Sequence, residues 1–114
     1  MSLLAFLVAQ AIPLAAKPPG ERAFMKCYSC HAATAGEHGL PGPNLANIIG
    51  RKAGSLPNFD YSPALKAADF VWDKARLDQF LQNPDSLTPG TPMTPPRLTA
   101  EERTTIIAYL AGDL

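Results

Sequence analysis

The stretch Cys27-Tyr28-Ser29-Cys30-His31 constrains this chain more than any other part of its sequence. It places an imidazole directly after two thiols, and the chain contains no other cysteine. A Cys-x-x-Cys-His run is typical of covalent haem attachment, in which both thiols bond to the haem vinyl groups and the histidine ligates the iron. The run therefore predicts a domain built around one haem c.

Two other kinds of site use a Cys-x-x-Cys pair, a zinc centre and a thiol–disulfide redox centre. A structural zinc site needs four ligands, and besides His31 the chain offers only His38 as a further histidine. A thioredoxin-type centre lies beside a βαβ pattern, and the sequence around the two cysteines lacks one. Neither alternative accounts for His31, so haem attachment is the favoured interpretation.

Length and composition favour one small helical domain. The chain has 114 residues, of which 12 are proline and 8 are glycine, and this predicts many loops and short helices. Few windows alternate apolar and polar residues with a period of two, so a sheet is not expected. The 10 basic and 10 acidic side chains cancel, which argues against a nucleic-acid-binding protein.

Residues 1–16, MSLLAFLVAQAIPLAA, carry no charge and read as a secretory signal peptide that lacks the usual positive start. They are shorter than the roughly 20 apolar residues of a membrane span, and a short N-terminal anchor is the alternative. Residues 17–19 are then a linker and residues 20–114 the domain. Export through this segment predicts a periplasmic protein in a bacterium, and N-terminal sequencing of the mature chain tests it.

Four segments of the domain are expected to be helices, and the stretches between them are rich in glycine and proline and are expected to be loops. The predictions rest on an apolar face, on a capping residue that starts or stops the helix, or on both. The segments are residues 20–26, residues 63–68 after Ser62 as N-cap, residues 73–82, and a last helix that begins at the capping box Thr99-x-x-Glu102 and ends near Gly112.

The iron needs a second axial ligand opposite His31, and the candidates are Met93, His38, Met25 and water. Met25 is too close in sequence to the cysteines to reach the far face and is expected in the core. His38 is expected to be a solvated loop residue. Met93 lies in the stretch TPMTPP, residues 91–96, where three prolines restrict the backbone around the thioether. Met93 is therefore the favoured ligand, and a gap-filling core methionine is the alternative.

The haem propionates need hydrogen-bond donors. Arg51 offers a fixed positive charge, and Tyr61, Trp72 and Thr91 offer O–H or N–H groups. For Tyr61 and Trp72 the alternative is apolar packing of the ring, with its polar atom in contact with water. For Arg51 the alternative is a charged side chain on a surface loop.

Taken together, these segments resemble the class I c-type cytochromes, of the mitochondrial cytochrome c and bacterial cytochrome c2 type. The resemblance covers residues 20–112 and needs no gap between Cys27 and Met93. Besides the haem-attachment run, the shared segments are Gly42-Pro43-Asn44-Leu45, Gly50-Arg51-Lys52-Ala53-Gly54, Phe59-Asp60-Tyr61, Trp72, Phe80-Leu81-Gln82-Asn83-Pro84, Pro89-Gly90-Thr91-Pro92-Met93 and Ile107-Ala108-Tyr109-Leu110.

The resemblance implies an all-α cytochrome c fold, in which short helices and long loops wrap around one covalent haem and the first and last helices cross. It implies that Cys27 and Cys30 form the thioether bonds, and that His31 and Met93 ligate the iron. It also implies that the Pro43 carbonyl accepts the other ring N–H of the histidine. The remaining implied roles are a buried propionate bound by Arg51, Tyr61 and Trp72, a helix crossing formed by Gly20, Phe24, Ile106 and Tyr109, and haem walls formed by Leu45, Ile48, Phe59, Leu77, Leu81 and Leu98.

Two departures from the family remove polar groups from the distal side of the haem. Phe80 stands where many relatives have a tyrosine whose hydroxyl touches the methionine sulfur, and Leu65 stands where an asparagine often orders a buried water. The resemblance therefore implies a drier pocket and a somewhat lower reduction potential than in those relatives.

A third departure concerns charge. Mitochondrial relatives ring the exposed haem edge with lysines, whereas the corresponding loop here contains Asp85, Ser86 and Pro92, and Lys26 and Lys52 are among the few retained cations. Electrostatic steering needs opposite charge fields, so electron transfer to the partner is expected to depend only weakly on salt.

The implied function is that of a monomeric one-electron carrier between respiratory or photosynthetic redox partners, and not of an enzyme. The partners would be proteins such as a quinol-oxidising complex, a terminal oxidase, a dehydrogenase or a reaction centre, with no nucleic acid and no small-molecule substrate. One alternative is a dedicated haem c subunit of a periplasmic dehydrogenase or oxidase complex. Another is an enzyme or gas sensor with an open iron site, which requires that Met93 does not ligate.

Overall fold

The computed structural model describes residues 17–113, so the expected signal segment, residues 1–16, lies outside the described part of the chain. Within residues 17–113 the regular structure is helical, and the sole β pairing is an isolated bridge between Lys52 and Val71. The expected all-α class is therefore confirmed. The elements are α1 (Pro19–Phe24), α2 (Pro63–Ala67), α3 (Lys74–Gln82), the 3-10 helix η2 (Pro84–Ser86) and α4 (Ala100–Leu110).

Side chains cap three of these helices where the sequence predicts it. The Ser62 hydroxyl and the Asp73 carboxylate each accept a backbone N–H from the first turn of the helix that follows. At α4, Thr99 accepts the N–H of Glu102 at 3.1 Å and the Glu102 carboxylate accepts the N–H of Thr99 at 3.1 Å, which is a complete capping box. These bonds satisfy N–H groups that have no partner within the helix.

The first helix is shorter than expected, because it ends at Phe24 and the backbone continues to the cysteines as successive turns. The Cys27 N–H donates to the Phe24 carbonyl at 2.7 Å, and the His31 N–H donates to the Cys27 carbonyl at 2.9 Å. Met25, which was expected in the core, is 39% exposed, so that expectation is wrong. The turn that follows α1 directs this side chain outward.

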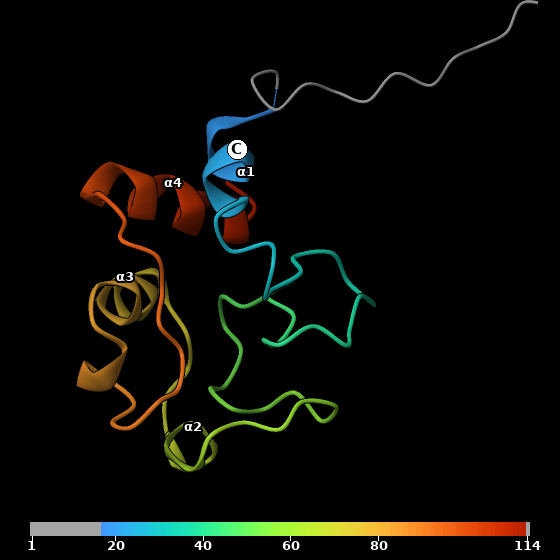
Figure 1. Ribbon diagram of the computed structural model, residues 1–114, viewed down its shortest axis with the longest axis vertical. Coiled ribbons are helices and arrows are strands. Elements are labelled where there is room, and N and C mark those ends of the chain that lie inside the picture. The colour runs from blue at the N-terminus through green and yellow to red at the C-terminus, as the bar shows by residue number, and fades with distance from the viewer. Residues whose placement is uncertain (1–16, 114) are drawn as a thin grey trace, which may run out of the picture.

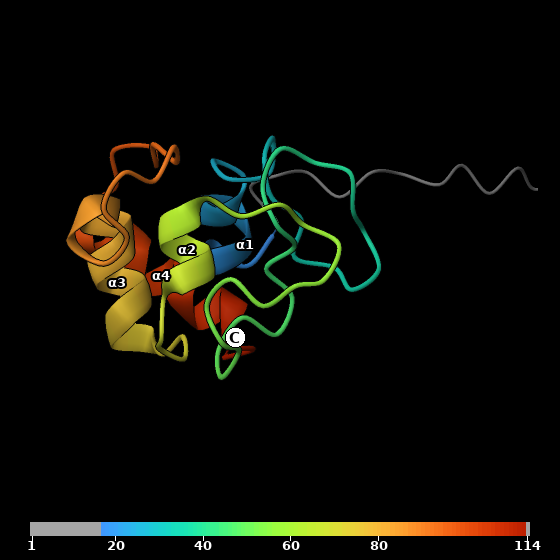
Figure 2. The same ribbon diagram turned by 90° about the horizontal axis from the view of Figure 1, so that it is seen from below.

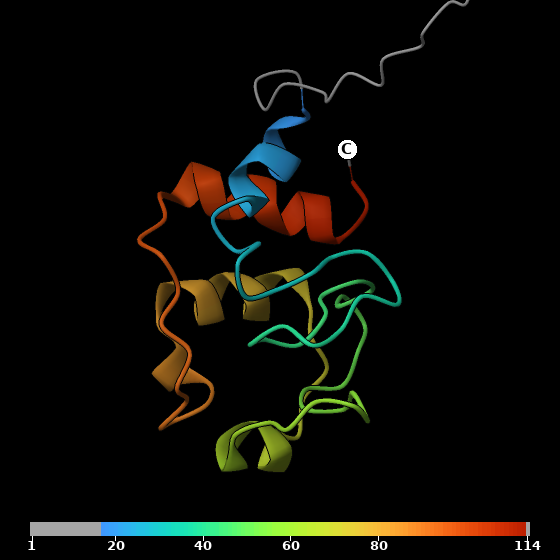
Figure 3. The same ribbon diagram turned by 45° about the vertical axis from the view of Figure 1, so that its right-hand side comes forward.

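The two ends of the domain are joined where α1 crosses α4 (Figure 3). Gly20 is buried at the crossing, and a Cβ on it would lie 2.6 Å from both the Thr105 carbonyl oxygen and the Tyr109 Cβ. The rings of Phe24 and Tyr109 lie beside this point with centroids 5.5 Å apart, and Ile106 is buried beneath them. The close approach of the two helices therefore requires the glycine.

The rest of the domain is arranged around a central space. Figure 1 shows α4, α3 and α2 in succession on one side of the molecule and the long loop after the cysteines on the other, and Figure 2 shows the same arrangement from below. The Nε of Arg103 on α4 donates to the Asp78 carboxylate on α3 at 2.8 Å. Among the described residues, no helix has both the length and the apolar character needed to cross a membrane.

Candidate haem site

A cavity of about 640 Å³ lies between the helices and the loops. Its lining comes from the cysteine segment, the loop over residues 41–62, the buried face of α3 and residues 91–96. All nine residues that the sequence assigns to the cofactor lie in this lining: Cys27, Cys30, His31, Pro43, Arg51, Tyr61, Trp72, Thr91 and Met93. The fold thus gathers around one cavity residues that lie between Cys27 and Met93 in the sequence.

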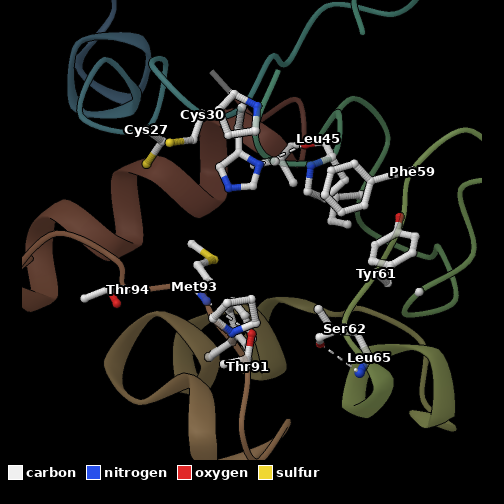
Figure 4. Close-up of a pocket in the computed structure, with 18 of the residues that line it drawn as sticks. Cys27, Cys30, Leu45, Phe59, Tyr61, Ser62, Leu65, Thr91, Met93 and Thr94 are labelled. Atoms are coloured by element: carbon white, nitrogen blue, oxygen red, sulfur yellow. Dashed lines mark hydrogen bonds between the residues drawn. The ribbon is translucent and has the colours of Figure 1, made fainter. Parts of the chain in front are cut away.

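The chemistry of the lining fits a covalently attached haem. Cys27 and Cys30 are both free thiols, and Figure 4 shows them on the wall of the cavity that faces Met93. Most of the other lining residues are apolar, and the volume lies in the range of pockets that enclose organic cofactors. Within the described residues, no group of three or more His, Cys, Asp or Glu side chains is placed to hold a metal ion, as a structural zinc site would require.

The His31 ring is held in one orientation by the loop that follows it. Its Nδ1 lies 2.8 Å from the Pro43 carbonyl oxygen, which can only accept, so Nδ1 carries the proton and donates. Gly42 lies against the ring, and a Cβ on Gly42 would come within 2.6 Å of the same nitrogen. The Gly42-Pro43 segment is shared with the resembling family, but the sequence does not predict that Gly42 touches the His31 ring. This contact depends on the path of the folded loop.

The protonation state of His31 suits a metal ligand. Burial lowers the pKa of the imidazole, and the hydrogen bond to the Pro43 carbonyl opposes this only in part. A neutral ring that donates through Nδ1 keeps a lone pair on Nε2.

Met93 reaches the cavity from the opposite wall. It is partly buried, packs against the core cluster that contains Leu77 and Phe80, and its backbone N–H donates to the Thr91 hydroxyl at 3.4 Å. Figure 4 shows its side chain pointing into the cavity from the loop that also carries Thr91 and Thr94. The Thr91 hydroxyl accepts this bond from the loop, and its O–H remains free to donate.

Two of the expected propionate donors, Arg51 and Trp72, lie on segments that the isolated bridge region holds together. The Trp72 N–H donates to the Arg51 carbonyl at 2.9 Å, and the Gly50 N–H donates to the Trp72 carbonyl at 2.8 Å. The Arg51 guanidinium donates to the backbone carbonyls of residues 44 and 46, and burial lowers its pKa. Tyr61 is also buried, and its hydroxyl accepts the N–H of Leu56 at 3.3 Å. Burying a cation is costly, so an anion beside Arg51 would stabilise it.

Some side chains expected near the haem lie elsewhere. Leu81 packs against the core cluster that contains Leu77 and Phe80, and Leu98 packs against the cluster of Phe24 and Cys27; neither is in the cavity lining. Lys52, Asp85 and Ser86 are exposed, so their expected place at the outer haem edge stays a prediction. The Asp85 carboxylate accepts the N–H of Gly90 at 3.0 Å, which closes the loop before Met93.

The two apolar departures on the distal side do line the cavity. Leu65 is partly buried, and Phe80 is 7% exposed and packs edge-on against Trp72 with ring centroids 5.2 Å apart. Neither side chain can donate a hydrogen bond.

Comparison with known proteins identifies the family. Residues 18–112 match the family model of cytochrome c. Cytochrome c2 from Rhodomicrobium vannielii is 41% identical over 94% of this chain and 88% of its own length, and cytochrome c-554 from Methylosinus trichosporium is 36% identical over 95% of this chain and 84% of its own. The solved structure of cytochrome cH from Methylobacterium extorquens has a TM-score of 0.73 and 38% identity, and it covers 82% of this chain and 95% of that one. The chain therefore belongs to the cytochrome c family, and it is a one-electron carrier with one covalent haem c, an electron-transfer protein and not an enzyme.

Proposed function

We propose that this carrier holds its haem between His31 and Met93 as the two axial ligands, with Cys27 and Cys30 as the thioether attachment points. The observation that carries the proposal is that one cavity is lined both by an imidazole oriented by the Pro43 carbonyl and by a thioether, which lies on the wall that faces the two cysteines. The bound haem supplies an iron that cycles between ferric and ferrous. With both axial positions filled by protein side chains, no position is left for a substrate, which suits electron transfer.

The protein side chains have distinct tasks in this arrangement. The Pro43 carbonyl fixes the histidine tautomer, so that Nε2 is the ligating atom. Met93 supplies a soft thioether, which favours the ferrous state and raises the potential. Arg51, Tyr61, Trp72 and Thr91 supply the hydrogen-bond donors for the propionates.

The redox partners of the carrier are other proteins, and we propose that it meets them in the bacterial periplasm. A quinol-oxidising complex or a dehydrogenase would be the donor, and a terminal oxidase or a reaction centre the acceptor. The names of the bacterial relatives, which include several cytochromes c2, and the uncharged segment 1–16 support this location. The alternative, a haem subunit of a larger complex, predicts that the native protein migrates at more than the monomer's size.

The ligand pair is tested by the near-infrared spectrum of the ferric holoprotein, together with an assay for covalent haem c. A sulfur-to-iron charge-transfer band at neutral pH is expected. A holoprotein without this band would have an open or differently ligated iron. That result would favour the alternative interpretation of the protein as an enzyme or a gas sensor.

The apolar distal wall leads to a prediction for Phe80→Tyr. A hydroxyl there can donate to the methionine sulfur, which weakens its electron donation to ferric iron and so favours the ferrous state. One net hydrogen bond of about 1 kcal/mol corresponds to a rise of roughly 40 mV in midpoint potential. Redox titration measures it, with Phe70→Tyr, outside the cavity lining, as the matched control. An unchanged or lower potential in Phe80→Tyr would count against a role for this site.

A further inference from the structure

We propose that Asn44 is a positioning residue, which holds the proximal histidine His31 and the propionate donor Arg51 on one strip of backbone. The strip consists of residues 42–46. Asn44 lies outside the cavity lining, so it acts on the cofactor only through its neighbours. This inference rests on the proposed function, because it takes His31 as the iron ligand and Arg51 as a partner of a propionate.

Two consecutive carbonyls of the strip bind these two groups. The Pro43 carbonyl accepts the Nδ1–H of His31 at 2.8 Å, and the Asn44 carbonyl accepts an Nη2–H of Arg51 at 2.7 Å. The two carbonyls belong to planar peptide groups that meet at the Asn44 Cα. The φ and ψ angles of Asn44 therefore fix the direction of one acceptor relative to the other.

The side chain of Asn44 restrains those angles. Its Oδ1 accepts the Ala46 N–H at 2.7 Å, which is an Asx turn. Its Nδ2 donates to the carbonyls of Thr34 and Glu37, each at 2.7 Å. This orientation of the amide is the favourable one, because a reversed amide would set its oxygen against two other oxygens. One partly buried side chain thus bonds to backbone groups before and after it in the chain.

Backbone hydrogen bonds attach the strip to the segment that carries the cysteines. The Gly42 N–H donates to the Cys30 carbonyl and the Leu45 N–H donates to the Ala32 carbonyl, each at 2.7 Å. The strip therefore runs beside the thiol and the imidazole, and at Gly42 it touches the His31 ring itself. A shift of the strip would turn the ring.

Arg51 joins the strip from the other side. Its Nη1 donates to the Ala46 carbonyl at 3.3 Å, in addition to the bond from Nη2 to the Asn44 carbonyl. Two bonds from one planar guanidinium fix the plane of that group, and with it the direction in which its other N–H groups point. The Asn44 side chain thus sets the direction of a cation toward the propionate as well as the orientation of the imidazole.

Hydrogen exchange, measured by NMR on the ferrous holoprotein, tests this role first in the wild type. The Asn44 Nδ2 protons, which are bonded to two carbonyls, should exchange at least about tenfold more slowly than those of Asn58. Asn58 is exposed and lies outside the cavity lining. Equal exchange at the two side-chain amides would overturn the proposal without any substitution.

Asn44→Ala removes all three side-chain bonds and adds no charge. Exchange of the His31 Nδ1–H and of the Arg51 Nη2–H should both accelerate about 5- to 30-fold, the effect of losing one or two net hydrogen bonds. Asn44→Ser can still accept the Ala46 N–H and donate one bond, so it should accelerate both exchange rates less. Acceleration at His31 alone would show that Arg51 is held independently, and would overturn the shared strip.

Two controls separate positioning from stability. Asn58→Ala, the same change at an exposed position, should leave both exchange rates unchanged. Gly20→Ala weakens the crossing of α1 and α4, and should accelerate exchange only as far as it lowers the free energy of unfolding. If Asn44→Ala accelerated exchange no more than Gly20→Ala at an equal loss of that free energy, Asn44 would have a structural role alone and the proposal would fail.

The ferric holoprotein gives a second readout, because the NMR shifts of its haem methyl protons depend on the plane of the axial imidazole. Asn44→Ala should change the spread of these shifts, whereas Gly20→Ala should not. An unchanged spread in Asn44→Ala would show that the strip does not orient the ring, and would overturn the proposal. A wild-type holoprotein without the near-infrared band would overturn the ligand pair instead, and would leave the protection of the Asn44 amide unaffected.

Discussion

Replacing Met93 with leucine is expected to abolish the near-infrared charge-transfer band and to lower the midpoint potential by about 0.1–0.3 V, a fraction of the roughly 0.8 V over which axial ligands set haem potentials. Leucine has nearly the volume of methionine, so the packing against Leu77 and Phe80 should survive. The thioether that favours ferrous iron is lost, and the iron gains an open position that external ligands can fill.

The matched control for this prediction is Met25→Leu. Met25 is 39% exposed and lies outside the cavity lining, so the same substitution there should leave both the spectrum and the potential unchanged. A Met93→Leu protein that keeps its band would assign the sulfur ligand to another methionine and would remove the main support for the proposed ligand pair.

Replacing Gly20 with alanine is expected to destabilise the holoprotein by about 1–3 kcal/mol, the usual cost of overpacking a close contact. In an open helix the same change would stabilise the protein by roughly 0.5–1 kcal/mol, so the sign of the effect is informative. The new Cβ would lie 2.6 Å from the Thr105 carbonyl oxygen and from the Tyr109 Cβ. The first is a backbone atom and the second is bonded directly to the backbone, so neither can move away by rotation of a side chain. Unfolding in guanidinium chloride, followed by circular dichroism, measures the change.

Gly112→Ala is the control for the crossing. Gly112 follows α4 with φ of +79°, and no atom lies within 4 Å of an added Cβ, so its cost comes from backbone strain alone, about 1 kcal/mol. If Gly20→Ala proved stabilising, or milder than Gly112→Ala, the two helices would not approach as closely as the structure indicates.

Local signals in the sequence predict much of the fold and the set of residues around the cavity. The caps at Ser62, Asp73 and Thr99 form as expected, because a cap depends on residues within one turn of it. The nine cofactor residues meet in one cavity, as the resemblance implies, although their ligand roles stay predictions.

The expectations that failed concern which way a side chain faces. Met25 is exposed because the turn after α1 directs it outward, and Leu81 and Leu98 pack against the core clusters and lie outside the cavity lining. Apolar character alone does not distinguish a cavity wall from the core behind it. The contact of Gly42 with the His31 ring was also unpredictable, because it joins residues whose separation is set by a long loop.

The crossing of α1 and α4 has a consequence for how the chain matures. α1 has six residues, and an isolated helix of that length is unstable in water. Its buried residues, Gly20 and Phe24, pack against residues 105–109, which lie at the other end of the domain and are synthesised after the segment that carries the cysteines. Until then the segment that carries Cys27 and Cys30 has nothing to fold against. Both thiols therefore stay accessible in a nascent chain, and the fold closes over the cofactor only after the whole domain has emerged.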